Sequence, residues 1–114
     1  MNDSRDIWQL VEAKQEPLIA LSDRVWATPG LCNSETRSAA EHKAELERHG
    51  FRISEGVAGI ATAMIGEAGD SGPVIAILGE YDALPGLSQE AGVAEHRPIE
   101  ASGHGHGCGH NLLG

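Results

Sequence analysis

Histidines and a cysteine alternate with glycines near the end of this 114-residue sequence, in the segment Gly103-His104-Gly105-His106-Gly107-Cys108-Gly109-His110. Imidazole nitrogen and thiolate sulfur are the ligands that Zn²⁺ and neighbouring transition metals prefer, and the glycines let the backbone fold tightly around one ion. Cys108 and His110 are two positions apart and can reach the same metal. The pattern predicts a metal site, and a flexible tail that binds metal adventitiously is the alternative.

Two carboxylates follow the apolar run Val74–Leu78, in the segment Gly79-Glu80-Tyr81-Asp82-Ala83-Leu84-Pro85. Side chains that follow an interior strand lie at the edge where open α/β sheets place their sites. Alternation puts Glu80 and Asp82 on one side, where Asp82 is available to bind a cation or to orient a metal-bound ligand through a hydrogen bond. The alternative is a solvated turn that leaves the sheet.

Helical periodicity fills most of the sequence before these motifs. Apolar residues recur at spacings of three and four over 6–26. A break is expected near Glu16, where Pro17 either kinks the helix or starts a second one. Another helix is predicted over 35–49, with Gly50 in the position that a helix C-terminus favours.

Past this point the period changes to that of strands. Alternation over 51–54 and 57–65 and the apolar run 74–78 predict three strands. The turn-rich segment 66–72 predicts a hairpin between the last two, with 74–78 in the interior of the sheet. Residues 79–109 show no periodicity and are expected to form a functional loop.

The elements together predict an α/β fold of single-domain length. We expect a helical part over 1–50, strands over 51–79 and metal-site loops over 80–114. The segment that starts at His110 is predicted to open a further helix.

Charge and composition exclude several classes of function. Eight Lys and Arg against seventeen Asp and Glu give a net charge of −9, which repels nucleic acid and anionic lipid surfaces. We therefore expect no nucleic-acid partner and no membrane partner. The longest apolar run is too short for a membrane helix and no leader peptide is recognisable, so we expect a cytoplasmic protein. Without a leader, Cys32 and Cys108 are not expected to form a disulfide.

Other residues that could do chemistry receive structural interpretations. Cys32 is predicted to be a buried small hydrophobic residue. His42 and His49 lie on the charged helix and are expected to be solvated. Trp8 and Trp26 occur at helical spacing and are expected to pack.

The two motifs, taken in order, resemble those of the M20 family of metallopeptidases and amidohydrolases, and the resemblance covers the whole chain. Within the family the chain is most similar to the aminobenzoyl-glutamate utilization B group. That group shares Glu80-Tyr81-Asp82, where commoner members have Asp-Met-Asp, and Asn111, where they have Asp. Trp26, Pro29 and Glu35 are also placed as in the family. The matching segments are Gly79–Leu84, Leu87–Gln89 and Gly105–Gly114.

The resemblance implies a zinc-peptidase-like catalytic domain of helices and a mixed sheet, with two divalent ions, Mn²⁺ or Zn²⁺, that activate water to attack an amide carbonyl. By position, Cys108 and His110 would be metal ligands, Asp82 a catalytic carboxylate that supports the metal centre, and His106 a neighbour of it. The implied substrate is p-aminobenzoyl-glutamate or a related N-acyl amino acid. The implied protein partner is a related A subunit, or a second copy joined through a lid domain.

In the family the general-base glutamate, the remaining ligands and the lid domain follow the point that matches Gly114. We therefore expect an incomplete N-terminal part of an amidohydrolase, inactive alone, whose full-length parent is an enzyme. Two alternatives come from other classes. A standalone Gly/His/Cys metal-binding module would bind metal tightly, and a degraded relative kept as an interaction partner would fold without metal.

Overall fold

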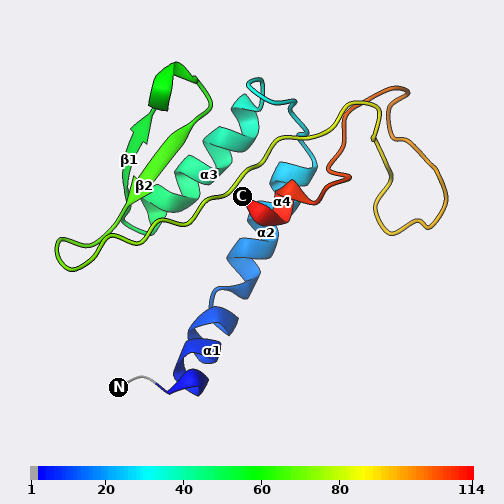
Figure 1. Cartoon of the computed structure of the whole chain (residues 1–114). Helices are drawn as coiled ribbons and strands as arrows, with labels where there is room; N and C mark the ends of the chain where they lie inside the picture. Colours follow the sequence, from blue (N-terminus) through cyan, green and yellow to red (C-terminus); the bar gives the residue numbers. More distant parts are fainter. Residues whose placement is uncertain (1–2) are drawn as a thin grey trace.

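The computed structural model describes residues 3–114, and its chain begins with two helices in succession (Figure 1). Helix α1 spans Ser4–Glu12 and helix α2 spans Gln15–Trp26. Asp3 caps α1 through reciprocal bonds with Asp6, which satisfies two backbone donors at the helix start. The predicted break is confirmed, because Pro17 lies in the first turn of α2, where a missing N–H costs no helical hydrogen bond.

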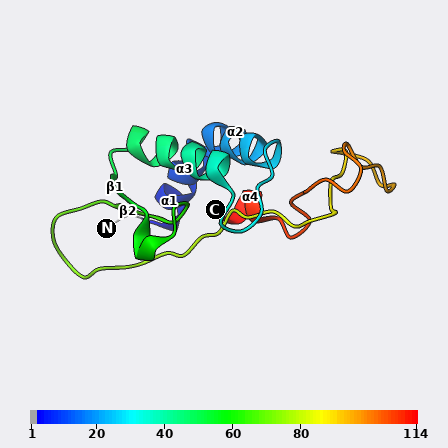
Figure 2. The same ribbon diagram turned by 90° about the horizontal axis from the view of Figure 1, so that it is seen from above.

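Helix α3 (Thr36–Arg48) packs against α2 and confirms the predicted second helical segment. Gly50 follows it with φ of 79°, a left-handed conformation that ends helices readily. Seen from above, α2 and α3 lie side by side, with the strands and extended segments on one side of them (Figure 2). The two helices, called the helix layer below, bury Leu21 and Val25 at their contact. Each such side chain contributes about 1.5–3 kcal/mol through apolar burial.

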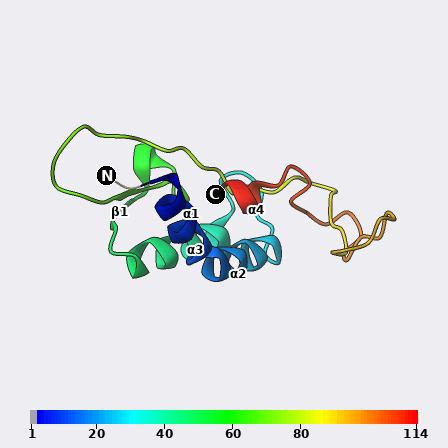
Figure 3. The same ribbon diagram turned by 90° about the horizontal axis from the view of Figure 1, so that it is seen from below.

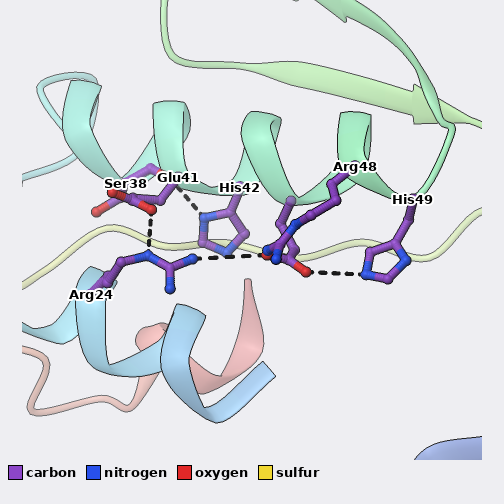
Figure 4. A network of polar contacts seen from close by, with 7 residues as sticks. Arg24, Ser38, Glu41, His42, Arg48 and His49 are labelled. Atoms are coloured by element: carbon purple, nitrogen blue, oxygen red, sulfur yellow. Dashed lines mark hydrogen bonds and ion pairs between the residues drawn. The ribbon is translucent and has the colours of Figure 1, made fainter. Parts of the chain in front are cut away.

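Much of what the helix layer buries is polar (Figure 4). Glu45 is only 5% exposed, and its carboxylate accepts hydrogen bonds from Arg48 and from His49 Nε2, the latter at 3.1 Å. Arg24 of α2 lies 3.8 Å from the same carboxylate and 2.6 Å from Glu41. Three cationic or titratable groups therefore surround one buried anion, which is the arrangement that a buried charge requires.

Two short strands follow the helices. Strand β1 (Arg52–Glu55) pairs antiparallel with β2 (Met64–Glu67), with Ile53 opposite Gly66, and the short helix η1 (Val57–Gly59) lies in their connection. Helix α3 packs on both strands. A Cβ at Gly66 would lie 3.1 Å from Leu46 of α3, so a glycine lets the sheet approach the helix closely.

The apolar run Val74–Leu78 departs from the sequence prediction. It forms no strand, its four large residues are 83–96% exposed, and β2 pairs with β1 rather than with this run. An apolar run records the environment that it suits but not the strand that pairs with it, and no described segment offers its backbone a ladder. Within residues 3–114 the sheet is thus a two-stranded antiparallel pair. The α and β content agrees with the predicted class, and the predicted mixed sheet is not present there.

Three further interpretations are corrected by the structure. Cys32 is exposed, because it lies in a surface turn between helices rather than under one. His42 is only 8% exposed, since it faces the helix layer and stacks on Tyr81 at 4.6 Å between ring centroids. Trp8 is 69% exposed on α1, while Trp26 is half-buried.

After β2 the described chain contains one more helix, α4 (His110–Leu113), which contacts α2. The segment between residues 85 and 105 projects away from the helices, as the view from below makes plain (Figure 3). None of the helices in residues 3–114 is long and apolar enough to cross a membrane.

Candidate metal centre

Residues 79–84 and 105–114, called the motif region below, are held together by a few bonds between distant segments. The Ala83 N–H donates to the Gly30 carbonyl at 2.7 Å, and Ala83 is 3% exposed. Its neighbour Leu84 exchanges two backbone hydrogen bonds of 3.0 Å with Gly105. A Cβ at Gly105 would overlap the Leu87 carbonyl, so this crossing requires glycine.

Tyr81 fixes the same segment from its other side. Its ring stacks on His42 of α3, and its hydroxyl donates to the Thr62 carbonyl. Burial, with a smaller contribution from the charge of Glu35, raises the pKa of Tyr81 above its ordinary value of 10.0. Because Tyr81 is anchored between α3 and residue 62, its neighbours Glu80 and Asp82 are placed without an anchor of their own.

Helix α4 positions the histidine of the second motif. Gly109 precedes the helix with φ of 78°, so the chain turns sharply just before His110. The Asn111 side-chain amide donates to Ser22 Oγ of α2 at 2.9 Å across 89 residues of sequence. The family-like Asn111 therefore ties α4, and with it His110, to the helix layer.

These supports bring three side chains together. His110 Nδ1 lies 2.8 Å from Asp82 Oδ1, and His110 Nε2 lies 3.6 Å from Glu80 Oε1. One potential ligand atom of each residue lies within 4.8 Å of the others. The side chains of His110 and Asp82 are 13% and 24% exposed, whereas that of Glu80 is 62% exposed. The group is thus closed on the side of the protein and open on the side of Glu80.

The geometry suits one divalent cation. A carboxylate that accepts the Nδ1–H of an imidazole fixes its tautomer and leaves the Nε2 lone pair for a metal, as in many carboxylate–histidine–metal sites. Asp82 is placed to do this for His110, and Nε2 then faces the Glu80 carboxylate. One imidazole nitrogen with carboxylate oxygens is a donor set that Zn²⁺ and Mn²⁺ both accept.

The other predicted ligand lies elsewhere. Cys108 is exposed and is not part of the Glu80–Asp82–His110 group, which is the one group of three or more such side chains found within residues 3–114. The glycine-rich segment thus contributes only His110 to that group. The described donors suffice for one ion and not for two.

His106 lies beside the group without joining it. Its Nε2–H donates to the Val25 carbonyl at 3.2 Å, and its Nδ1 is buried with no hydrogen-bond partner among the described residues. Burial lowers the pKa of His106 below its ordinary value of 6.5, and the nearby His110 acts in the same direction, against the Val25 carbonyl and Asp82. The neutral ring therefore serves as a spacer between α2 and the motif region.

Sequence reasoning anticipated that Asp82 and His110 belong to one site, but it assigned no ligand role to Glu80. The signal was present, because Glu80 precedes Asp82 by two positions in an extended segment and shares its side.

Comparison with known proteins agrees with the motif resemblance. No family model matches the chain. The chain is 43% identical over 110 residues to the B subunit of p-aminobenzoyl-glutamate hydrolase from Escherichia coli (strain K12). The match covers 96% of this chain and 23% of the relative, so the chain spans about a quarter of that protein's length. The recognised resemblance, to the B subunit of an aminobenzoyl-glutamate hydrolase, is thereby confirmed along almost the entire chain.

Proposed function

We propose that this chain supplies part of the metal centre of an M20-type amidohydrolase that cleaves the amide bond of p-aminobenzoyl-glutamate or a related N-acyl amino acid. The observation that carries the proposal is the meeting of Glu80 and Asp82 with His110 across 28 residues of sequence. Similarity to a hydrolase subunit over the same residues supports it.

The chemistry proposed for the site follows from its donors. A bound divalent ion would polarise the amide carbonyl and lower the pKa of a water molecule. In this chain, Asp82 holds the His110 ring in one tautomer, and Glu80 offers a carboxylate on the open side. We propose two ions, Mn²⁺ or Zn²⁺, with Cys108 as a ligand of the second and with the remaining ligands and the general base supplied by other residues of the working enzyme.

The partners proposed for the enzyme are the amide substrate and a related A subunit, or a second copy of the same chain joined through a lid domain. The name of the relative, which identifies it as one lettered subunit of a hydrolase, supports a paired subunit. We also propose that the enzyme works in the cytoplasm.

A chimera tests the proposal directly. This chain replaces the 110 matching residues of the Escherichia coli relative, and p-aminobenzoate release from p-aminobenzoyl-glutamate is measured with the A subunit present. We expect the chimera to hydrolyse the substrate. His110→Ala and Asp82→Asn should each lower kcat by about 100-fold, in line with losses at ligands and at the groups that orient them. His96→Ala, at an exposed loop histidine, is the matched control. A folded chimera without activity would contradict the proposal.

Metal titration of the 114-residue chain separates the proposal from the standalone module. We expect weak zinc binding that is lost in His110→Ala and kept in Cys108→Ser, and no amidase activity. Tight binding that is lost in Cys108→Ser but survives Asp82→Asn would favour a module built on the glycine-rich segment.

A further inference from the structure

A cleft of about 530 Å³ lies beside the motif region, between the end of α2 and the projecting segment. This volume falls in the range of small-molecule sites, about 300–1,000 Å³. Trp26 and Pro29 line one side of it, and Leu87, Val93 and Ile99 line the other. Leu87 and Ile99 are 44% and 68% exposed, so apolar surface remains available to a ligand. The walls suit a flat apolar group, because aromatic rings stack on Trp and on aliphatic side chains.

The charges at this cleft have one sign. No Lys or Arg lines it, and two carboxylates do, those of Glu90 and Glu100. Glu90 pairs with Arg97 at 3.5 Å, whereas Glu100 has no cationic partner among residues 3–114. The backbone of Glu100 is fixed, because its N–H donates to the buried Ser88 Oγ at 3.1 Å and its carbonyl accepts from Gly103. A free, positioned carboxylate favours a ligand that donates a hydrogen bond and repels one that carries a carboxylate.

The cleft and the metal-binding group are built on the same two stretches of chain. Leu87 follows Asp82 after the turn at Pro85, and the cleft residues 104–107 run directly into Cys108 and His110. His106 belongs to both surroundings, since it lines the cleft and its pKa responds to Asp82 and His110. A molecule seated in the cleft is therefore adjacent to the proposed reaction centre.

We propose that this cleft binds the aromatic amine half of the substrate, with its ring against Trp26 and its amino group donating to the Glu100 carboxylate. The inference rests on the proposed function and deepens it by dividing the substrate between two surfaces. The p-aminobenzoyl half is neutral and donates hydrogen bonds, which matches the cleft. The glutamate half carries two carboxylates and must be bound by cationic groups other than the residues that line this cleft.

Binding of a neutral probe to the 114-residue chain tests the inference without metal or catalysis. The probe is 4-aminobenzamide, and the readout is the indole N–H signal of Trp26 in a Trp8→Phe background, measured by NMR with a chelator present. We expect saturable shifts of this signal, and no comparable shift with glutamate or with 4-carboxybenzamide. Glu100→Gln should weaken the binding of 4-aminobenzamide about tenfold, the effect of losing a hydrogen bond to a charged acceptor. Glu95→Gln, outside the cleft, is the matched control and should leave binding unchanged.

A charge reversal makes the test independent of folding. Glu100→Lys should reverse the preference, so that 4-carboxybenzamide binds more tightly than 4-aminobenzamide. Equal binding of both probes to the original chain, or no reversal in a folded variant, would overturn the inference. Asp82→Asn and His110→Ala should keep probe binding although they lose zinc. Zinc binding without probe binding would therefore refute the cleft alone, and probe binding without zinc binding would refute the metal centre alone.

Discussion

The helix layer and the motif region are stabilised by different means. In the helix layer, backbone hydrogen bonds are local, and the buried Glu45 is surrounded by Arg24, Arg48 and His49. In the motif region, single bonds join residues far apart in sequence, such as Asn111 to Ser22 and Leu84 to Gly105. The contrast teaches that the stability of this chain and its chemistry are carried by separate residues, so substitutions should be able to affect one without the other.

The largest expected effect comes from Gly105→Ala. The new methyl group overlaps the Leu87 carbonyl, which is backbone and cannot move aside. We expect a loss of about 3 kcal/mol in the free energy of unfolding, as for severe overpacking. Zinc affinity should fall more than tenfold, because the Leu84–Gly105 bonds position the motif region. Urea unfolding and zinc titration check both quantities.

Gly107→Ala is the matched control for that substitution. Its new methyl group meets only the flexible end of the Leu87 side chain. The destabilisation should be smaller, about 1 kcal/mol or less. Equal losses at the two glycines would remove the role given to the Leu84–Gly105 crossing.

Next in size is Glu45→Gln in the helix layer. The substitution removes the buried anion from its three partners, and we expect a loss of about 2 kcal/mol, less than for a fully buried pair because Arg24 and Arg48 are partly solvated. Zinc binding should not change beyond the fraction of protein that unfolds. Glu47→Gln, at an exposed position 4.0 Å from Lys43, should have little effect. A specific loss of zinc affinity in Glu45→Gln would show that the two regions are coupled.

Asn111→Ala tests the link between the regions. It removes the bond to Ser22 Oγ and should cost about 1 kcal/mol of stability, the usual contribution of one hydrogen bond. Because α4 carries His110, zinc affinity should fall several-fold as well. A double-mutant cycle with Ser22→Ala isolates the bond, and additive effects would argue against it.

The smallest effect is expected from the ion pair between Lys43 and Glu55, which lie 2.7 Å apart and join α3 to β1. The hydrogen bond and the charge of Glu55 raise the pKa of Lys43 above its ordinary value of 10.5. A raised folded-state pKa stabilises the fold below pH 10.5, and that stabilisation is lost as the pH rises through the folded value. Lys43→Met should flatten the alkaline limb of a stability–pH profile, whereas an unchanged limb would exclude the pair as its cause.

Local patterns in the sequence were sufficient to predict the helices. Periodicity, the position of Pro17 and the glycine at residue 50 each act within a few residues, so α2 and α3 were predictable. The exposure of Val74–Leu78 was not predictable, because apolar composition specifies burial but does not identify a partner strand. His42 was placed in solvent because helix charge does not reveal which face meets Tyr81.

For the candidate site, residue chemistry indicated more than spacing did. Asp82 and His110 were predicted to share a site, and the structure places them in contact. Cys108 was assigned to the same metal-binding segment as His110 because the two are close in sequence. The sharp turn at Gly109 separates neighbours along the chain, so sequence proximity could not show whether the thiol joins the group.

The crossing of Ala83 and Leu84 also bears on the rate of folding. Ala83 pairs with the segment at Leu31 and the next residue pairs with Gly105, so three distant stretches must meet within two residues. Closing such loops costs chain entropy before any contact repays it, whereas α2 and α3 are neighbours in sequence. The helix layer should therefore form early and the metal-binding group last. A newly made chain would pass through a helical intermediate that is not yet able to hold an ion.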